Sequence, residues 1–286
     1  MEDLLGNLML SYSNDWGKHH LDALGLAEAQ KNILTGFYTT VTNFSTDKFG
    51  YNNLQAGAVR LWEGTNSYYE DPRLSSFLGR VNYVYAGKYV ATVNARADAS
   101  SKVGKNNKWG FFPSVSAAWV ITEEDFMKQF TFLNNLKLRA GYGLSGNQDA
   151  IDSYNSLQLV KPNGVVSVGG SPTVTMGVIR NANPDLKWEK TLSWNVGIDL
   201  SLFQNSMEVS FDYYKKETSD IVVEKEIPIE NGFRKMYINS GAIDSEGYEL
   251  QVKLSPLSTR EWSWTVNFLS LIHIPSPRDR QKSRMP

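Results

Sequence analysis

The amino-acid sequence predicts an all-β protein, and more specifically part of a transmembrane antiparallel β-barrel. Three observations lead to this prediction. Apolar and polar side chains alternate with a period of two, which is typical of a strand with one apolar and one polar face. The alternating runs reach ten residues or more, whereas soluble strands average about five to six residues and a bilayer needs about nine to eleven tilted ones. The connections are alternately short and long.

The alternation places two kinds of side chain on opposite faces. In the segment 186–202, Trp194, Val196 and Ile198 share one face, while Asn195 and Gly197 share the other. Small and charged residues on one face, with aromatic residues near the ends of the other, suit a wet lumen and a wall facing lipid. The same division recurs in 89–98, 136–145, 207–214, 248–254 and 262–268.

The alternating segments predict about ten strands in chain order. Short connections opposite long ones match the periplasmic turns and extracellular loops of outer-membrane barrels. The first two strands alternate poorly, and the segment 32–72 has room for further pairing. Residues 122–130 predict one helical turn with Thr122 as its N-cap. The expected strand centres are Leu8, Leu21, Val81, Val93, Val115, Leu138, Val196, Val209, Leu250 and Val266. The short connections are 15–18, 86–88, 203–206 and 255–261, and the long ones are 32–72, 99–109, 146–187 and 218–239.

Composition excludes several classes of function. The 286 residues carry a formal net charge of −1, so nothing indicates binding to nucleic acid. Cysteine is absent, which excludes disulfides, thiolate catalysis and Cys-type zinc sites. The sequence contains no run of 18 apolar residues, so it predicts no transmembrane helix. The residues after Met1 also lack the features of a signal peptide. Either the protein is cytoplasmic or its true N-terminus lies upstream of Met1, and the strand pattern of the rest of the sequence favours the second alternative.

One glycine motif fits a nucleotide-binding pattern by spacing alone. Gly141-Tyr-Gly-Leu-Ser-Gly146 matches G-x-G-x-x-G, which binds pyrophosphate only where a helix opens after it. The residues that follow have no helical period. We interpret Gly141 and Gly143 instead as relieving crowding on the lumen face, and we expect no bound cofactor.

Acidic residues are numerous enough to consider a paired-carboxylate hydrolase. Their positions on the lumen face favour ion pairs in a solvated lumen, with Arg80, Arg96, Arg139 and Lys253 as partners. His19 and His20 beside a turn resemble an exposed pair more than a ligand set, so we expect no catalytic or metal site and no enzyme. The acidic residues considered are Asp185, Glu189, Asp199, Glu208, Asp212 and Glu249.

Three aromatic residues in the first long loop are weak candidates for ligand binding. Trp62, Tyr68 and Tyr69 can stack on sugar rings, and loops on rigid scaffolds often carry function. Tyrosine is abundant throughout the chain, so packing within the loop or a place in the aromatic girdle explains these residues at least as well.

Several segments resemble the barrel of the SusC/RagA family of TonB-linked outer-membrane proteins. They follow the family's order and cover roughly residues 75 to 268, whereas residues 1–74 match loosely. The segments are Ser76-Phe-Leu-Gly-Arg-Val-Asn-Tyr through Lys88-Tyr, Arg96-Ala-Asp-Ala-Ser-Ser through Gly104-Lys-Asn-Asn-Lys-Trp to Trp119, Leu136-Lys-Leu-Arg-Ala-Gly-Tyr-Gly through Gln148, Asn183-Pro-Asp-Leu-Lys-Trp-Glu-Lys-Thr, Asn195-Val-Gly-Ile-Asp, Phe211-Asp-Tyr-Tyr-Lys-Lys and Asn239-Ser-Gly-Ala-Ile-Asp-Ser-Glu-Gly-Tyr-Glu-Leu.

The resemblance implies that residues 1–268 are part of a barrel of about 22 strands. Family members also carry a signal peptide, an N-terminal extension, a TonB-contacting segment and a plug, and we expect all four to lie outside this chain. Family barrels end on a strand with a terminal aromatic residue. Here Phe268 precedes 269–286, where two prolines and a basic run do not suit a paired strand. Leu269 to Asp279 resembles a translated transposase-adapter sequence, so we expect 269–286 to be a non-native tail without a site at His273.

The function implied by the resemblance is active import across the outer membrane of a Gram-negative bacterium. A SusD-like lipoprotein would cover the barrel and capture an oligosaccharide or a peptide, and TonB would move the plug. This fragment would contribute lipid-facing wall and outer loops. Three alternatives stay open: a siderophore or cobalamin receptor without a lipoprotein lid, an outer-membrane β-barrel enzyme, and a soluble β-sandwich or adhesin.

Overall fold

Ten long antiparallel strands of the described residues form one curved sheet. The structure is a computed structural model, and it describes residues 1–228, 230, 235–258 and 261–275. Each predicted strand centre lies in one of these strands, so the all-β prediction is confirmed. In spatial order the strands are β1 (Glu2–Trp16), β2 (His19–Phe44), β4 (Arg73–Tyr85), β5 (Tyr89–Ser100), β6 (Trp109–Val120), β7 (Leu133–Asn147), β10 (Glu189–Leu202), β11 (Met207–Ser219), β14 (Ala242–Ser258) and β15 (Ser263–Pro275).

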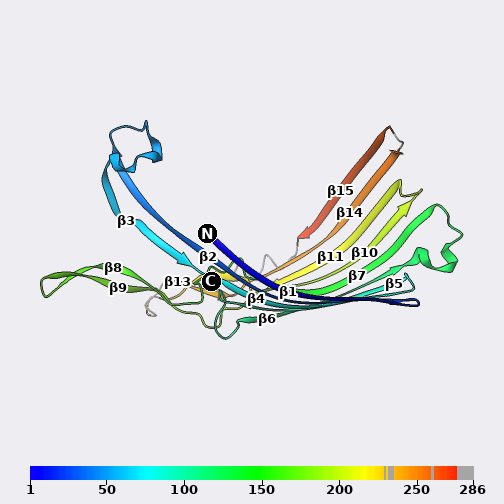
Figure 1. Ribbon diagram of the computed structural model, residues 1–286, viewed down its shortest axis with the longest axis horizontal. Helices are drawn as coiled ribbons and strands as arrows, with labels where there is room; N and C mark the ends of the chain where they lie inside the picture. The colour runs from blue at the N-terminus through cyan, green and yellow to red at the C-terminus, as the bar shows by residue number, and fades with distance from the viewer. Residues whose placement is uncertain (229, 231–234, 259–260, 276–286) are drawn as a thin grey trace.

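The sheet forms an open trough (Figure 1). Its short turns lie together at one end, and the long connections lie at the other, as the sequence predicts. Gly17 and Gly87 have φ of 65° and 70° in the first two short turns, a conformation that glycine adopts without steric cost. β1 and β15 are the two edges of the sheet. Along this path every strand is antiparallel to its neighbours, which is the arrangement of a barrel wall.

The long connections contain strands of their own. β3 (Gly57–Glu70) pairs with the outer half of β2 and extends this hairpin beyond the sheet. β8 (Leu159–Val168) pairs with β9 (Ser171–Arg180), and β12 (Val222–Glu226) pairs with β13 (Lys235–Asn239). The room for pairing noted in 32–72 is therefore filled by β2 and β3. No helix in the described residues has the length and apolar character to cross a membrane.

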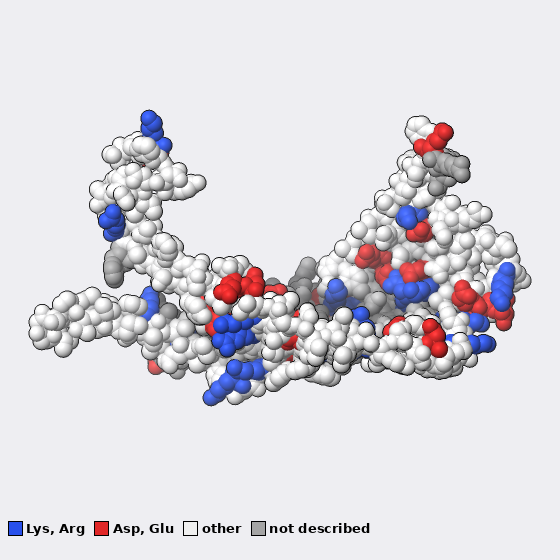
Figure 2. All heavy atoms as spheres, viewed as in Figure 1, with Lys and Arg blue, Asp and Glu red and all other residues white. Residues whose placement is uncertain are grey.

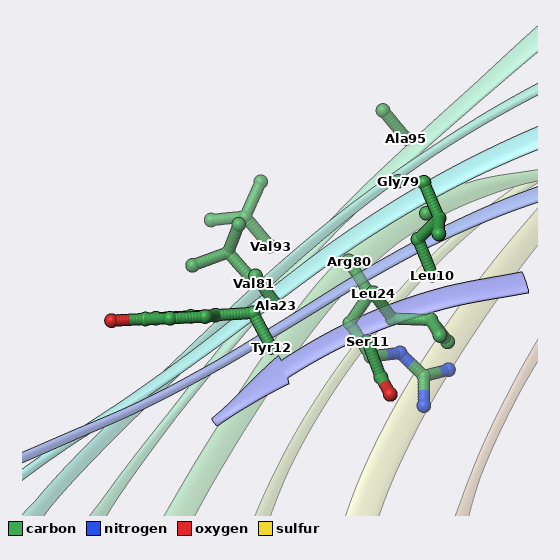
Figure 3. A pocket seen from close by; sticks show the side chains of 11 residues that line it. Leu10, Ser11, Tyr12, Ala23, Leu24, Gly79, Arg80, Val81, Val93 and Ala95 are labelled. Atoms are coloured by element: carbon green, nitrogen blue, oxygen red, sulfur yellow. The ribbon is translucent and has the colours of Figure 1, made fainter. Parts of the chain in front are cut away.

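The two faces of the sheet differ in chemistry as the alternation predicts. Figure 3 shows Val81 and Val93 on one side of the strands and Arg80 and Ser11 on the other. Val93 is 54 % exposed, because no other layer of the described residues covers the apolar face. On the concave side, acidic and basic side chains gather (Figure 2). The apolar face therefore suits lipid and the concave face suits water.

Aromatic residues line the apolar face at two heights. Near the short turns, Tyr89 stacks with Tyr85 and with Trp119, with ring centroids 6.4 Å apart in both pairs. Near the long loops, Phe77 stacks with Trp109 at 6.1 Å. Phe77 and Tyr85 are eight residues apart on β4, or about 27 Å along the strand. This spacing is close to the apolar band of about 25 Å in outer-membrane barrels.

The helical turn after β6 differs from the prediction. Two short 3-10 turns, η3 (Ile121–Glu123) and η4 (Asp125–Met127), replace the single capped turn, and Thr122 is not an N-cap. The first turn begins as soon as β6 ends at Val120, which places Thr122 inside it. The Thr122 hydroxyl instead accepts a hydrogen bond of 3.4 Å from the backbone N–H of Leu136.

The last strand continues beyond Phe268, where the sequence predicted its end. Leu269 pairs with Gln251, and the pairing continues to Pro275 opposite Ser245. β15 is an edge strand, and edge strands tolerate proline because one side of their backbone has no neighbouring strand. The rest of the proposed tail, 276–286, lies outside the described residues, and the non-native origin of 269–286 stays a prediction.

Glu124 links two of the short turns to Tyr89 and Trp119, which belong to the stacked aromatic residues near those turns. Its carboxylate accepts hydrogen bonds from Lys88 Nζ (2.7 Å), the Tyr89 hydroxyl (2.7 Å) and Trp119 Nε1 (3.2 Å). The Lys88 ammonium, followed by the Tyr89 hydroxyl, holds the pKa of Glu124 below its ordinary value. The charged form of Glu124 therefore stabilises the fold above that ordinary value, and this contribution is lost as the pH falls through the lowered pKa.

Replacing Glu124 by Gln should lower the midpoint of thermal unfolding at neutral pH, because Lys88 loses its charged partner. The loss of stability as the pH falls below the ordinary pKa of a glutamate should then be smaller in Glu124→Gln than in the parent chain. Unfolding in detergent micelles at several pH values measures both effects. Glu123→Gln is the control, since Glu123 is exposed. Equal unfolding curves for the two variants would contradict the assignment.

Candidate functional site

An ion-pair network lies on the concave face, where β7, β10 and β11 run side by side. Arg139 donates to both oxygens of Asp199, at 2.7 and 2.8 Å, and to Asp212 at 3.0 Å. Ser210 donates to Asp199 at 2.9 Å. Both carboxylates therefore take part in a structural ion-pair network around the same guanidinium. The pairing supports a static polar wall and not a hydrolytic carboxylate pair.

A glycine makes this network possible. Gly197 stands directly between Arg139 and Asp212 in the strand register. A Cβ added to Gly197 would collide with the Asp212 carboxylate and would lie 2.9 Å from Arg139 Nη2. Arg139 therefore reaches Asp212 across a strand only because Gly197 leaves a gap in the row of side chains.

The other predicted lumen pairs are only partly formed. Lys253 contacts Glu208 at 3.0 Å, and Arg96 contacts Asp98 at 2.9 Å. Arg80 instead donates to the Asn94 amide oxygen at 2.7 Å. The lumen wall therefore combines ion pairs with neutral hydrogen bonds.

The glycine motif at 141–146 has the role that we predicted. A Cβ at Gly141 would lie 2.5 Å from the Asn195 side chain, and one at Gly143 would lie 2.8 Å from Ser114 Cβ. At Gly146 it would overlap the Phe112 ring. β7 continues through the motif to Asn147, so no helix opens there. Gly141 and Gly143 thus make room for the Asn195 and Ser114 side chains on the concave face, as predicted.

The buried apolar cluster of the described residues lies at the loop end of the sheet. Leu186 and Ile151 are fully buried, and the Trp188 ring packs edge-on against Phe112 at a centroid distance of 5.6 Å. Val103 completes the cluster. These residues come from the connections 101–108, 148–158 and 181–188 and from β6. The outer loops therefore share one small core, which we call the loop platform.

Polar contacts join the loops of this platform. Backbone N–H groups of Gly104 and Asn106 donate to the carbonyls of Leu186 (2.8 Å) and Pro184 (3.1 Å). Asn106 Nδ2 donates to Asp185 at 2.7 Å. The segments 104–109 and 183–189, both quoted for the family resemblance, thus meet in space.

Two further side chains attach the loop before β14. Asn239 Oδ1 accepts from the Lys187 N–H at 2.8 Å, and its Nδ2 donates to the Asp220 carbonyl at 2.7 Å. Glu189 is 8 % exposed, and its carboxylate accepts from the Val222 N–H (2.9 Å) and from Asn147 Nδ2 (2.8 Å). Both side chains complete backbone hydrogen bonding in the platform. Asp185 and Glu189 therefore have structural roles.

The structure separates the three aromatic candidates. Tyr68 and Tyr69 are neighbours on β3, so their side chains point to opposite faces. Tyr68 is 45 % exposed and shares its face with its partner Gly36. Tyr69 is 54 % exposed, and its carbonyl accepts from the Tyr154 hydroxyl at 2.6 Å. The side chain of Trp62 lies outside the described residues.

The histidines do not form a ligand set. His19 contacts the Tyr83 hydroxyl at 2.5 Å, whereas His20 contacts Asp15 (2.7 Å) and Asp22 (2.9 Å). Within the described residues, no group of three or more His, Cys, Asp or Glu side chains is arranged to hold a metal ion.

Sequence reasoning missed Arg180, which joins β9 to the platform. It donates to the Tyr154 carbonyl at 2.6 Å and to Asn155 Oδ1 at 2.9 Å, and it lies over the Tyr237 ring at 5.4 Å. Nothing in the local sequence signals these contacts, because the partners are 25 to 57 residues away.

The gap at Gly197 gives a first test of the lumen network. Gly197→Ala should destabilise the sheet by about 1–3 kcal/mol, because the added methyl group displaces Asp212 from Arg139. Chemical unfolding in detergent micelles measures the change. Gly79→Ala is the matched control, since a Cβ on this strand glycine meets no atom within 4 Å. Equal effects of the two substitutions would show that the gap is unimportant.

The loop platform depends on Trp188 in the same way. Trp188→Ala should cost about 3–5 kcal/mol, because Trp188 is 5 % exposed and the cavity would open the platform core. Amide hydrogen exchange should then rise in 101–108 and around Val222 while β5 and β7 keep their protection. Trp264→Ala, at an outward position that is 61 % exposed, should leave the exchange of the loops unchanged. Unchanged loop exchange in Trp188→Ala would refute the shared core.

Comparison with known proteins identifies the family. The profile of the TonB dependent receptor-like, beta-barrel family matches residues 4–276. TonB-dependent receptor P3 of Formosa agariphila is 36 % identical over 260 residues, which are 91 % of this chain and 26 % of that protein. TonB-dependent receptor SusC of Bacteroides thetaiotaomicron is 33 % identical over 198 residues, which are 68 % of this chain and 20 % of that protein. The chain thus spans about a quarter of the length of these relatives.

Solved structures agree with this fold. The RagAB peptide importer in its open-open state aligns with a TM-score of 0.76 and 26 % identity, over 95 % of this chain and 29 % of that one. The ferric enterobactin receptor PfeA of Pseudomonas aeruginosa aligns with a TM-score of 0.59 at 16 % identity, over 94 % and 36 %, and so supports the fold alone. The profile match and the relatives show that this chain belongs to the TonB-dependent receptor-like β-barrel family of the bacterial outer membrane.

Proposed function

We propose that the complete protein imports glycans or peptides through its barrel, driven by TonB and aided by a SusD-like surface lipoprotein. One observation carries this proposal: membrane-crossing strands present a hydrated, charge-paired face to the lumen, and the loops above it fold into a common platform. Similarity to SusC and to the RagAB peptide importer supports the substrate classes.

The residues of this chain would line the transport pathway with charged side chains that are paired with one another. Arg139 is neutralised by Asp199 and Asp212, and Lys253 is paired with Glu208. Charges that are paired within the wall hold a passing solute less strongly than free charges would. A wall of this kind favours passage of large polar solutes over tight storage of one ion.

The moving parts would lie outside this chain. Energy transfer from TonB needs a plug and a TonB-contacting segment, and the described residues form wall and loops only. The loop platform would face the surface lipoprotein. Its shared core would let that partner rest on one stable surface instead of several separate loops.

A siderophore receptor is the second candidate. PfeA shares the barrel fold, but at 16 % identity that likeness supports the fold alone, whereas SusC and the RagAB importer are similar to the chain at higher identity. The outer loops also carry the 104–109 and 183–189 contacts that belong to the SusC/RagA resemblance. We therefore favour the glycan or peptide importer.

Deletion of the complete gene in its source bacterium tests the function. Uptake of labelled oligosaccharides or peptides should fall at least tenfold for one of these substrate classes, and an uncoupler should abolish the same uptake in the parent strain. Monosaccharide uptake is the control. Loss of ferric siderophore uptake alone would favour the second candidate. Long-read sequencing should also place a SusD-like gene beside the complete gene.

A further inference from the structure

The β2–β3 arm carries a pair of tyrosines on its lumen side. The β2 register runs without a shift from Asp22 opposite Asn82 to Tyr38 opposite Asn66, across β4 and then β3. Even-numbered residues of β2 therefore stay on one face, which is the face of the hydrated lumen wall. Tyr38 and Tyr68 both lie on this face, two residues apart along the strand pair, or about 7 Å.

The aromatic ring of Tyr68 lies over Gly36 on the neighbouring strand. Its Oη, Cζ and Cε1 atoms are 2.5 to 2.8 Å from the place where a Cβ on Gly36 would stand. The end of the Tyr68 ring therefore covers the backbone of Gly36, and any side chain there would lift it. The residue stays 45 % exposed, so the ring is supported from below and accessible from the lumen.

Support of a glycine by a cross-strand aromatic ring is also a structural device of sheets. That role explains the contact between Tyr68 and Gly36, but it does not explain the neighbouring Tyr38, which is 51 % exposed on the same face. Two accessible rings beside each other at the loop end of the lumen wall form a surface that a solute meets as it enters. We call Gly36, Tyr38, Asn66 and Tyr68 the tyrosine platform.

The polar groups of the tyrosine platform are neutral. Asn66 Nδ2 reaches the Tyr38 hydroxyl at 3.4 Å, a long contact that leaves both groups able to bind other partners. Glu70 lies two residues beyond Tyr68 on β3, and its Oε2 already accepts from the Ser153 hydroxyl at 2.6 Å. Aromatic faces with amide and hydroxyl groups at their edge suit the apolar face and the hydroxyl rim of a sugar ring.

We propose that the tyrosine platform binds a neutral oligosaccharide, with a sugar ring stacked on Tyr68 and its hydroxyl groups bonded to Tyr38 and Asn66. This inference rests on the proposed import function and names its substrate class. Tyr69 takes no part, since it lies on the other face of β3. A peptide is less suitable, because its charged termini would meet no free charge on the tyrosine platform.

The test uses the complete protein, purified in detergent micelles, and three probes: maltoheptaose, cellohexaose and laminarihexaose. Saturation-transfer NMR and calorimetry should detect at least one of them at millimolar concentration. Tyr68→Ala should weaken that binding roughly fivefold to tenfold, because it removes one aromatic stacking surface. Tyr68→Phe should keep most of the affinity, and Tyr69→Ala is the matched control that should keep all of it.

Each other outcome overturns the inference. It fails if none of the three probes binds, if Tyr69→Ala weakens binding as much as Tyr68→Ala, or if a tripeptide competes equally. Circular dichroism and the Tyr68→Phe variant exclude misfolding as the cause of a loss. Failure here is separate from failure of the import function, because the gene deletion reports uptake whether or not Tyr68 binds the sugar.

Discussion

The need to pair every backbone polar group inside a hydrocarbon layer governs this structure. Lipid offers no hydrogen-bond partner, so a membrane-crossing sheet must satisfy each strand through its neighbours. The ten strands do this in one antiparallel sequence from β1 to β15. The edges of β1 and β15 await partners, and a complete barrel provides them. The length of the strands and the distance between the two sets of aromatic residues both match the thickness of the bilayer.

A sheet held by its backbone frees its side chains for other tasks. The outward side chains need only be apolar, and the inward ones need only be hydrated and mutually compensated. Arg139 with its two carboxylates shows how the inward face is neutralised, and Gly197 shows that a missing side chain can matter as much as a present one. Hydrophobic packing stabilises the loops at the end of the sheet, where strand pairing stops. Ile151, Leu186 and Trp188 hold together loops that would otherwise be independent.

The resemblance segments have a physical meaning in this arrangement. Segments 104–109 and 183–189 are about 80 residues apart in the chain, yet they meet through backbone hydrogen bonds and the Asn106–Asp185 contact. They specify how the loops fold over the end of the wall.

The sequence alone determined the class of fold, the positions of the ten long strands and the division into apolar and polar faces. All three follow from a period of two, which a strand imposes locally and which ten residues suffice to display. The roles of Gly141 and Gly143 on the lumen face were also predictable. Thr122, the end of β15 and the pairing of Arg80 were not, because each depends on where a neighbouring strand stops or which partner it offers. Tertiary structure alone decided that Tyr68 faces the lumen while Tyr69 does not, and that Arg180 anchors a hairpin. The face on which each side chain lies and the partner that it contacts depend on strand register and on residues distant in sequence. The sequence of a single strand does not contain that information.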